Sequence, residues 1–360
     1  MAAPDPLPIS ATDDATSRAT WIKSTIQEVQ SRFLDGVVFD FEGPLLPADR
    51  VNINYVLLVN ETREALHSAV PGSQISVCLA WNPHGVDGRY YDNLNLMTAA
   101  DLAYIMSYDT RSQILDQCVA SANAALPATR WGLKEYLTLG ADPQKMILGV
   151  PWYGYDYSCV GGGVGGGREN RGGNVTTRGA GGAGGWGGGR GAATTSPALA
   201  MEEEDDDEEE GMDPLGITCP MALVPFRGVD CSDAAGVQVP YSVIQARLIA
   251  GKTTTGRLWD SYMETPFYNY VSEEDGSVHQ VHYDDAESLR LKYGVARELG
   301  LRGVGPYTFD DLPGGGEGGR EGEAAARGVW EALRYFTEEE VEEGNEEGGG
   351  GRGGSRMGGR

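Results

Sequence analysis

Short apolar segments that alternate with stretches of helical spacing constrain the fold of this 360-residue chain more than any other feature. Five such segments are predicted strands, at residues 36–42, 74–81, 103–108, 145–152 and 302–309. Apolar residues three and four positions apart predict helices, at residues 11–33, 51–70, 112–125 and 288–299. Strands and helices in this alternation are typical of parallel βα units, so we expect an α/β fold.

Each predicted strand ends in aromatic or acidic residues, namely Glu42, Trp81, Tyr108 with Asp109, Trp152 with Tyr153, and Tyr307. This pattern is typical of a (β/α)8 barrel of the TIM type, whose chemistry lies at the carboxyl ends of its strands. An open doubly wound sheet is the alternative. It is less favoured because no Gly-rich phosphate loop follows any of the strands. Residues 224–283, rich in aromatics and turns, predict a small α+β excursion before the last strand.

The first predicted strand carries two carboxylates on one face. Side chains alternate along a strand, so Asp40 and Glu42 share a side with Val38, while Phe39 and Phe41 point the other way. The strand contains no Lys or Arg, and burying two such carboxylates without a partner lowers stability unless a proton or ligand compensates. We therefore expect acid chemistry here. The alternative is a strand end whose acids simply meet solvent.

The formal charge of −25 comes largely from two acidic runs, at residues 202–210 and 338–347. No basic stripe is present, which argues against nucleic acid as a partner, and no apolar run approaches the roughly 20 residues that span a bilayer. The Gly-rich and acidic composition of residues 161–213 and 337–360 predicts a disordered insert and tail. The expected catalytic domain is then residues 11–336, with the insert inside it.

The five cysteines show neither CxxC nor mixed Cys/His spacing, so we expect no metal site. Two of Cys159, Cys219 and Cys231 could form a disulfide across one loop in an oxidising compartment and leave the third free. Residues 1–10 lack a basic start and an apolar core typical of a signal peptide, so either the chain is cytosolic or its true N-terminus is missing.

Two motifs overlap predicted strands: Asp35, Gly36, Asp40 and Glu42 match the pattern D-G-x-D-x-D-x-E except at Val38, and residues 106–109 match M-x-Y-D. With these motifs the chain resembles glycoside hydrolase family 18. Further similar stretches are residues 149–157, 224–228, 231–236, 283–285 and 301–305. The resemblance covers most of residues 21–312 apart from the insert.

The resemblance implies an enzyme that hydrolyses β-1,4 bonds between N-acetylglucosamine units, of the chitobiose type, by substrate-assisted retaining catalysis. Glu42 would be the general acid and then the base, Asp40 would orient the substrate acetamido group, and Tyr108 would donate its hydroxyl to that group. The implied substrate-binding residues are Asp109, Met106, Trp81, Trp152, Tyr153, Arg227 and Tyr307. For each aromatic ring taken singly, core packing is an equal alternative.

The nucleophile in this scheme belongs to the sugar, so no cofactor and no metal is expected. The expected partner is an N-acetylglucosamine oligosaccharide, with no nucleic acid or membrane bound, and the protein is expected to be a monomer. The resemblance also implies a lysosomal or secreted protein.

Three departures from the family pattern qualify these expectations. Val38 stands where the family has a polar residue, which would leave Asp40 without a hydrogen-bond partner. Tyr307 replaces a tryptophan beneath the reacting sugar. The family has three strands before Asp35, which predicts an incomplete barrel with strands four to eight only and a truncated N-terminus. The alternatives are a weakly active or inactive sugar-binding protein and a fragment that does not fold.

Overall fold

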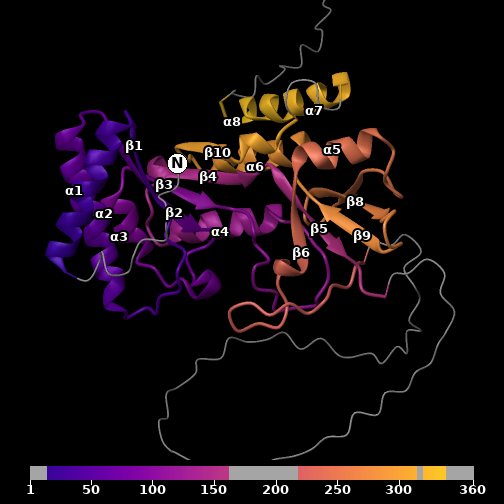
Figure 1. Ribbon diagram of the computed structural model, residues 1–360, viewed down its shortest axis with the longest axis horizontal. Coiled ribbons are helices and arrows are strands. Elements are labelled where there is room, and N and C mark those ends of the chain that lie inside the picture. Colours follow the sequence, from indigo (N-terminus) through magenta and orange to yellow (C-terminus); the bar gives the residue numbers. More distant parts are fainter. Residues whose placement is uncertain (1–13, 162–217, 314–318, 338–360) are drawn as a thin grey trace, which may run out of the picture.

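The computed structural model describes residues 14–161, 218–313 and 319–337, and these form two five-stranded sheets (Figure 1). The first sheet is parallel, with the strand order β1 (Gly36–Phe39), β2 (Gln74–Ala80), β3 (Leu102–Met106), β4 (Met146–Pro151) and β10 (Gly303–Tyr307). The second is antiparallel, with the order β6 (Gly236–Pro240), β5 (Tyr153–Ser158), β9 (Val278–His282), β8 (Thr265–Val271) and β7 (Leu258–Asp260). All five predicted parallel strands are confirmed.

The helices of the described residues are α1 (Ala15–Ser31), α2 (Arg50–Ala69), α3 (Asn93–Ala99), α4 (Leu126–Thr138), α5 (Tyr241–Ile249), α6 (Ala286–Glu298), α7 (Gly319–Ala332) and α8 (Arg334–Thr337). Figure 1 shows α1, α2 and α3 beside β1 at one end of the molecule and α5 with the antiparallel sheet at the other. Helices α7 and α8 lie over α6. The antiparallel sheet and α5 confirm the predicted α+β excursion, which also takes in β5.

The two faces of the parallel sheet differ in burial. On β2, Ile75, Val77 and Leu79 are fully buried in the main core, where α2 and α6 pack, while Ser76 and Cys78 on the other face are partly exposed. Strand β1 repeats the pattern, because Phe39 is buried and Val38 is 44% exposed. The alternation of strand side chains therefore directs the apolar residues toward the helices and leaves a second, partly open face. Because the strands are parallel, their carboxyl ends all meet at one edge.

The segment Tyr283-Asp284-Asp285 starts α6 through three separate contacts. The Asp285 carboxylate accepts hydrogen bonds from the backbone N–H groups of Glu287 and Ser288, and the Ser288 hydroxyl completes the capping box. Asp284 pairs with Lys292 in the core, and both side chains are essentially inaccessible. Capping and a buried ion pair thus fix the helix that covers the parallel sheet.

The predicted helix at residues 112–125 is wrong. That segment is irregular and makes strand-like bridges to the excursion, with the Ile114 N–H donating to the Cys231 carbonyl and the Ala120 N–H to the Cys219 carbonyl, both within 3 Å. The helix begins only at Leu126, with Pro127 in its first turn, where the missing N–H has no intrahelical partner to lose. Tertiary pairing therefore replaced the local helical bonds.

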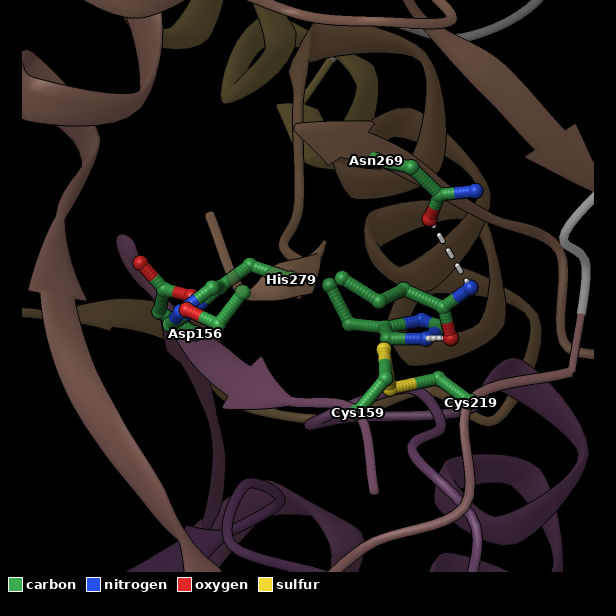
Figure 2. Close-up of a disulfide and its surroundings, with 8 residues drawn as sticks. Asp156, Cys159, Cys219, Asn269 and His279 are labelled. Atoms are coloured by element: carbon green, nitrogen blue, oxygen red, sulfur yellow. Dashed lines mark hydrogen bonds and ion pairs between the residues drawn. A yellow bond between two sulfur atoms is a disulfide. The ribbon is translucent and has the colours of Figure 1, made fainter. Parts of the chain in front are cut away.

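Two disulfides join the loop after β3 and the end of β5 to the excursion. Cys159 bonds to Cys219, as one of the predicted pairings, but the expectation that the third cysteine stays free is wrong because Cys231 bonds to Cys118. Figure 2 shows the Cys159–Cys219 bond beside Asp156 and His279 of the antiparallel sheet. Among the described residues, Cys78 is the free cysteine.

The predicted insert at residues 161–213 and the predicted tail at residues 337–360 lie outside the described residues except for their first positions. Within the described ranges, no helix has both the length and the apolar character needed to cross a bilayer.

Candidate active site

The carboxyl edge of the parallel sheet collects the residues that the sequence singled out. Asp40 and Glu42 follow β1, Tyr108 and Asp109 follow β3, and Tyr307 ends β10. In addition to burial, the charge of Asp40 raises the pKa of Tyr108, and the charge of Glu42 raises the pKa of Asp109. These groups are therefore close enough to act on one another electrostatically. The structure therefore brings together groups that are up to 267 positions apart, from Asp40 to Tyr307.

Asp40 lies beside Cys78 of the neighbouring strand. The register pairs Val38 with Ser76 and Phe39 with Val77, which places Cys78 beside Asp40 on the open face. Desolvation and the nearby Glu42 carboxylate raise the pKa of Asp40, while a hydrogen bond with the Cys78 thiol and the charge of Arg89 lower it. Sequence reasoning missed Cys78. The sequence signal is that Cys78 lies two residues after Ser76 on β2, on the same face, just as Asp40 lies two residues after Val38 on the paired strand β1.

Glu42 forms an ion pair that the strand sequence did not indicate. Its Oε2 accepts a hydrogen bond from Nη1 of Arg89 at 2.5 Å, and its side chain remains 54% exposed. Arg89 is only 8% exposed and binds Asp87 through Nη2 at 2.9 Å. The cation absent from β1 is thus supplied by the loop after β2, and this contact was also missed.

Arg227 reaches the same place from the excursion. Its Nη1 donates to the Asp87 carbonyl at 2.9 Å and its Nη2 to the Glu42 carbonyl at 3.2 Å. The turn at Arg227 and Gly228 has positive φ at both residues, 43° and 92°, which directs the chain sharply back. Arg227 therefore joins the excursion to the loops after β1 and β2.

Aromatic rings form one wall of the carboxyl edge. The rings of Tyr108 and Tyr307 stack with centroids 5.5 Å apart and planes 17° apart, and Tyr153 meets both rings edge-on. Tyr307 is 51% exposed, so about half of this residue is open to solvent. Burial raises the pKa of Tyr108 far above its usual value, which keeps its hydroxyl a hydrogen-bond donor at all ordinary pH values.

Asp109 is held rigidly at the end of β3. Its φ of 50° is left-handed, its N–H donates to Asn123 Oδ1 at 2.7 Å, and its Oδ1 accepts from the hydroxyls of Tyr153 and Tyr155 at 2.6 and 3.0 Å. Burial raises the pKa of Asp109, and the two tyrosine hydrogen bonds oppose that rise. Tyr153 is thus fixed by Asp109, as well as packed against Tyr307.

Two residues with expected substrate contacts are buried. Trp152 is 1% exposed and its ring meets Trp330 of α7 at 4.8 Å, inside the main core. Met106 at the end of β3 is 9% exposed. Trp81, which follows β2, is partly exposed, and its ring packs against Trp131 of α4 at 5.7 Å. For Trp152 the structure has the core packing that the sequence left open as the alternative.

Asp233 is a further carboxyl near the site that sequence reasoning did not select. It is 8% exposed, its Oδ2 has no hydrogen-bond partner among the described residues, and burial, followed by the charges of Asp109 and Asp87, raises its pKa to about 7. Only its place beside Cys231, in a stretch already noted for its family resemblance, could have marked it. The excursion thus adds, in Asp233, a second buried carboxyl group whose pKa is raised by the charge of Asp109 as well as by burial.

Comparison with known proteins gives consistent matches. The profile of "Glycosyl hydrolases family 18" matches residues 9–311. Di-N-acetylchitobiase of Rattus norvegicus is 32% identical over 297 residues, which cover 82% of this chain and 66% of that protein. Di-N-acetylchitobiase of Homo sapiens is 30% identical over 321 residues, which cover 89% of this chain and 69% of that protein. The chain thus spans about two thirds of the length of these relatives.

Solved structures show the same fold at lower identity. A family GH18 chitinase from Cycas revoluta in complex with allosamidin gives a TM-score of 0.58 at 18% identity, covering 90% of this chain and 76% of that one. A class V chitinase from Nicotiana tobaccum gives 0.57 at 17% identity, covering 89% and 75%. The parallel sheet is therefore of the TIM-barrel-like α/β type. Because the family profile spans most of its length, this chain belongs to glycosyl hydrolase family 18.

Proposed function

We propose that this protein hydrolyses the β-1,4 linkage between two N-acetylglucosamine units, as in chitobiose, by a substrate-assisted retaining mechanism. The observation that carries the proposal is the gathering of Asp40, Glu42 and Tyr108 at one edge of the parallel sheet, beside the half-exposed Tyr307. The names of the relatives from Rattus norvegicus and Homo sapiens agree with this choice of substrate.

Glu42 is the proposed acid–base residue. Its carboxyl is half-exposed, and its Oε1 accepts no hydrogen bond from any residue that the structure describes, so this oxygen can reach a substrate. Glu42 protonates the leaving oxygen and afterwards, as a carboxylate, takes a proton from the attacking water.

Asp40 and Tyr108 orient the acetamido group. The acetamido carbonyl oxygen attacks the anomeric carbon, the acetamido N–H then gains positive character, and the Asp40 carboxylate stabilises it. The Tyr108 hydroxyl donates to the acetamido group, which the raised pKa of this tyrosine permits throughout the ordinary pH range. Position 38 is Val instead of the family's polar strand residue, and the Cys78 thiol beside Asp40 is a neighbouring group that lowers its pKa.

The sugar rings contact the exposed part of Tyr307, and Asp109 and Arg227 complete the binding surface. Tyr153 is buried and acts by holding Asp109, while Arg227 ties the excursion to the Glu42 loop. Trp152 is assigned to core packing, in agreement with its contact to Trp330, whereas the partly exposed Trp81 is kept as a proposed sugar contact.

The two disulfides support a location outside the reducing cytosol, in a lysosomal or secretory compartment. The proposed active form is a monomer.

The test is hydrolysis of di-N-acetylchitobiose by the purified full chain, followed by proton NMR of the anomeric signals. Each cleavage releases the former reducing-end sugar with the anomeric mixture it already had, and one newly formed reducing sugar. We expect the newly formed sugar to appear first as the β-anomer, as an early excess of β over the starting mixture, because a retaining mechanism conserves the configuration. An early excess of the α-anomer would contradict the retaining mechanism. Binding of chitobiose without turnover would instead favour a sugar-binding protein, and neither binding nor turnover would overturn the proposed function.

A further inference from the structure

Arg89 contacts the Glu42 carboxylate and is only 8% exposed, and its guanidinium donates hydrogen bonds in three directions. Nη1 donates to Glu42 Oε2 at 2.5 Å, Nη2 donates to Asp87 Oδ2 at 2.9 Å, and Nε donates to the Val86 carbonyl at 3.3 Å. A guanidinium with donors engaged in three directions cannot rotate without losing one of them. The position of Nη1, and with it the place of the Glu42 carboxylate, is therefore fixed.

The surroundings of Arg89 are built from two loops that are themselves joined. The Leu45 N–H donates to the Gly88 carbonyl at 3.0 Å, and the Tyr90 N–H donates to the Leu45 carbonyl at 3.1 Å. The Tyr91 hydroxyl lies within hydrogen-bond distance of the Gly43 and Phe41 carbonyls, at 2.6 and 2.9 Å. These bonds lock the loop after β1, which carries Glu42, to the loop after β2, which carries Arg89.

Asp87 completes the support behind Arg89. It is buried, its Oδ1 accepts from the Ser112 hydroxyl at 2.6 Å, and its backbone carbonyl accepts from Arg227. Asp87 already balances the buried charge of Arg89, since the two groups pair at 2.9 Å. The second contact of Arg89, to a carboxylate that is half-exposed, is therefore not required to neutralise the cation.

We infer that Arg89 is a positioning residue for Glu42, which it orients through Nη1. The inference rests on the proposed function. The fixed guanidinium holds Glu42 Oε2, so Oε1 keeps one direction when Glu42 gives its proton to the leaving oxygen. The same contact keeps the carboxylate in place when it takes a proton from the attacking water, and Arg89 does this without touching the substrate.

The inference predicts that removing the Arg89 side chain lowers the kcat by a factor that depends on the leaving group of the substrate. A sugar alcohol must be protonated to leave, whereas a nitrophenolate leaves without a proton. Arg89→Met keeps the length of the side chain and removes its charge and donors. We expect its kcat on di-N-acetylchitobiose to fall about 100-fold, within the range for general acid catalysis, with KM unchanged within about twofold. On 4-nitrophenyl N-acetyl-β-glucosaminide we expect the kcat to fall less than about tenfold.

Two further variants separate positioning from folding. Arg89→Lys retains one charged donor, so we expect it to recover about a tenth or more of the kcat. Ser112→Ala removes only the hydroxyl that supports Asp87, and we expect a loss of about fivefold on chitobiose, in case Arg89→Met fails to fold. Arg130→Gln is the matched control, because Arg130 makes a two-bond pair with Glu298 between α4 and α6, outside the site.

The outcomes are distinct. A loss on chitobiose that exceeds the loss on the aryl substrate, with recovery by Lys, supports the inference. Equal losses on both substrates, or no loss on either, overturn it and leave the proposed function standing. No hydrolysis of chitobiose by the unmodified chain overturns the proposed function and the inference with it.

Discussion

Two carboxylates in this protein each contact an arginine, but their surroundings differ. Glu42, at the edge of the parallel sheet, is 54% exposed and uses one oxygen for Arg89, while its other oxygen has no partner within the described ranges. Asp156, in the antiparallel sheet, is 9% exposed and uses both oxygens, accepting from Arg247, Tyr270 and His279 at 2.7–2.8 Å. A carboxylate with one exposed oxygen that accepts no hydrogen bond can exchange a proton with a substrate. A carboxylate whose two oxygens both accept hydrogen bonds from neighbouring elements instead stabilises the fold.

The Asp156 network also shows why distances alone do not define a catalytic site. Ser277, His279 and Asp156 are linked in series, with 2.9 Å from Ser277 Oγ to Nε2 and 2.8 Å from Nδ1 to Asp156. The single hydroxyl proton of Ser277 has an acceptor in Asp275 Oδ1 at 2.6 Å, and Arg247 already pairs with Asp156. The serine is therefore not poised to give its proton to the histidine, unlike in a hydrolase triad.

Replacing Glu42 by Gln should have the largest effect, and it tests whether the exposed carboxylate of the pair is the acid–base residue. Glutamine keeps the shape and removes the transferable proton, so we expect hydrolysis of chitobiose to fall at least about 100-fold, with the melting temperature and the Kd for chitobiose nearly unchanged. Steady-state kinetics and calorimetry measure these quantities. Turnover at the rate of the unmodified chain would exclude Glu42 as the acid–base residue.

Replacing Asp156 by Asn should affect stability instead of chemistry. The change removes the charge shared by Arg247 and His279, and we expect the free energy of unfolding to fall by about 2 kcal/mol, less than for a fully enclosed pair because Arg247 is 28% exposed. Urea unfolding measures this value, with Asp142→Asn at the exposed start of a short 3-10 turn as a control. A loss of kcat without a loss of stability would reverse the roles assigned to the two carboxylates.

Replacing Asp233 by Asn should have no effect on stability at low pH, and its effect should appear only as a dependence on pH. The folded pKa of Asp233, about 7, lies above the unfolded value of 3.8, so the folded chain binds the extra proton between these pH values and stability falls as pH rises through that window. Asp233→Asn cannot titrate. We expect its melting temperature to match that of the unmodified chain at pH 4 and to exceed it progressively up to pH 8; a constant difference would show that Asp233 does not titrate in this range.

The sequence predicted the parallel strands because each is an apolar run between turn signals, and such runs need no distant partner to be recognised. It predicted Asp40, Glu42 and Tyr108 as a set through their motifs, and the structure places them at one edge. Their chemical roles remain predictions. The helix at residues 112–125 was wrong because its backbone groups pair with Cys219 and Cys231, more than 90 positions away, which local spacing does not reveal.

The partners of the carboxylates could not be predicted for a related reason. Arg89 lies in a loop after β2, and only the bridge between Leu45 and Arg89 brings it to Glu42. Cys78 could be placed beside Asp40 only once the register of β1 against β2 was known. Likewise, nothing in the sequence around Trp152 distinguishes a ring that packs on Trp330 from one that contacts sugar.

The Cys159–Cys219 bond has a consequence for how this chain can vary. It holds two residues 60 positions apart with their Cα atoms 4.9 Å apart, so the chain leaves β5 and re-enters the excursion at one covalently fixed point. The entropy of closing a loop grows only slowly with its length, and here the bond sets the closure regardless of what lies between. Because the bond holds both ends of the intervening sequence, we expect Tyr153 and Arg227 to keep their positions when the length of that sequence changes.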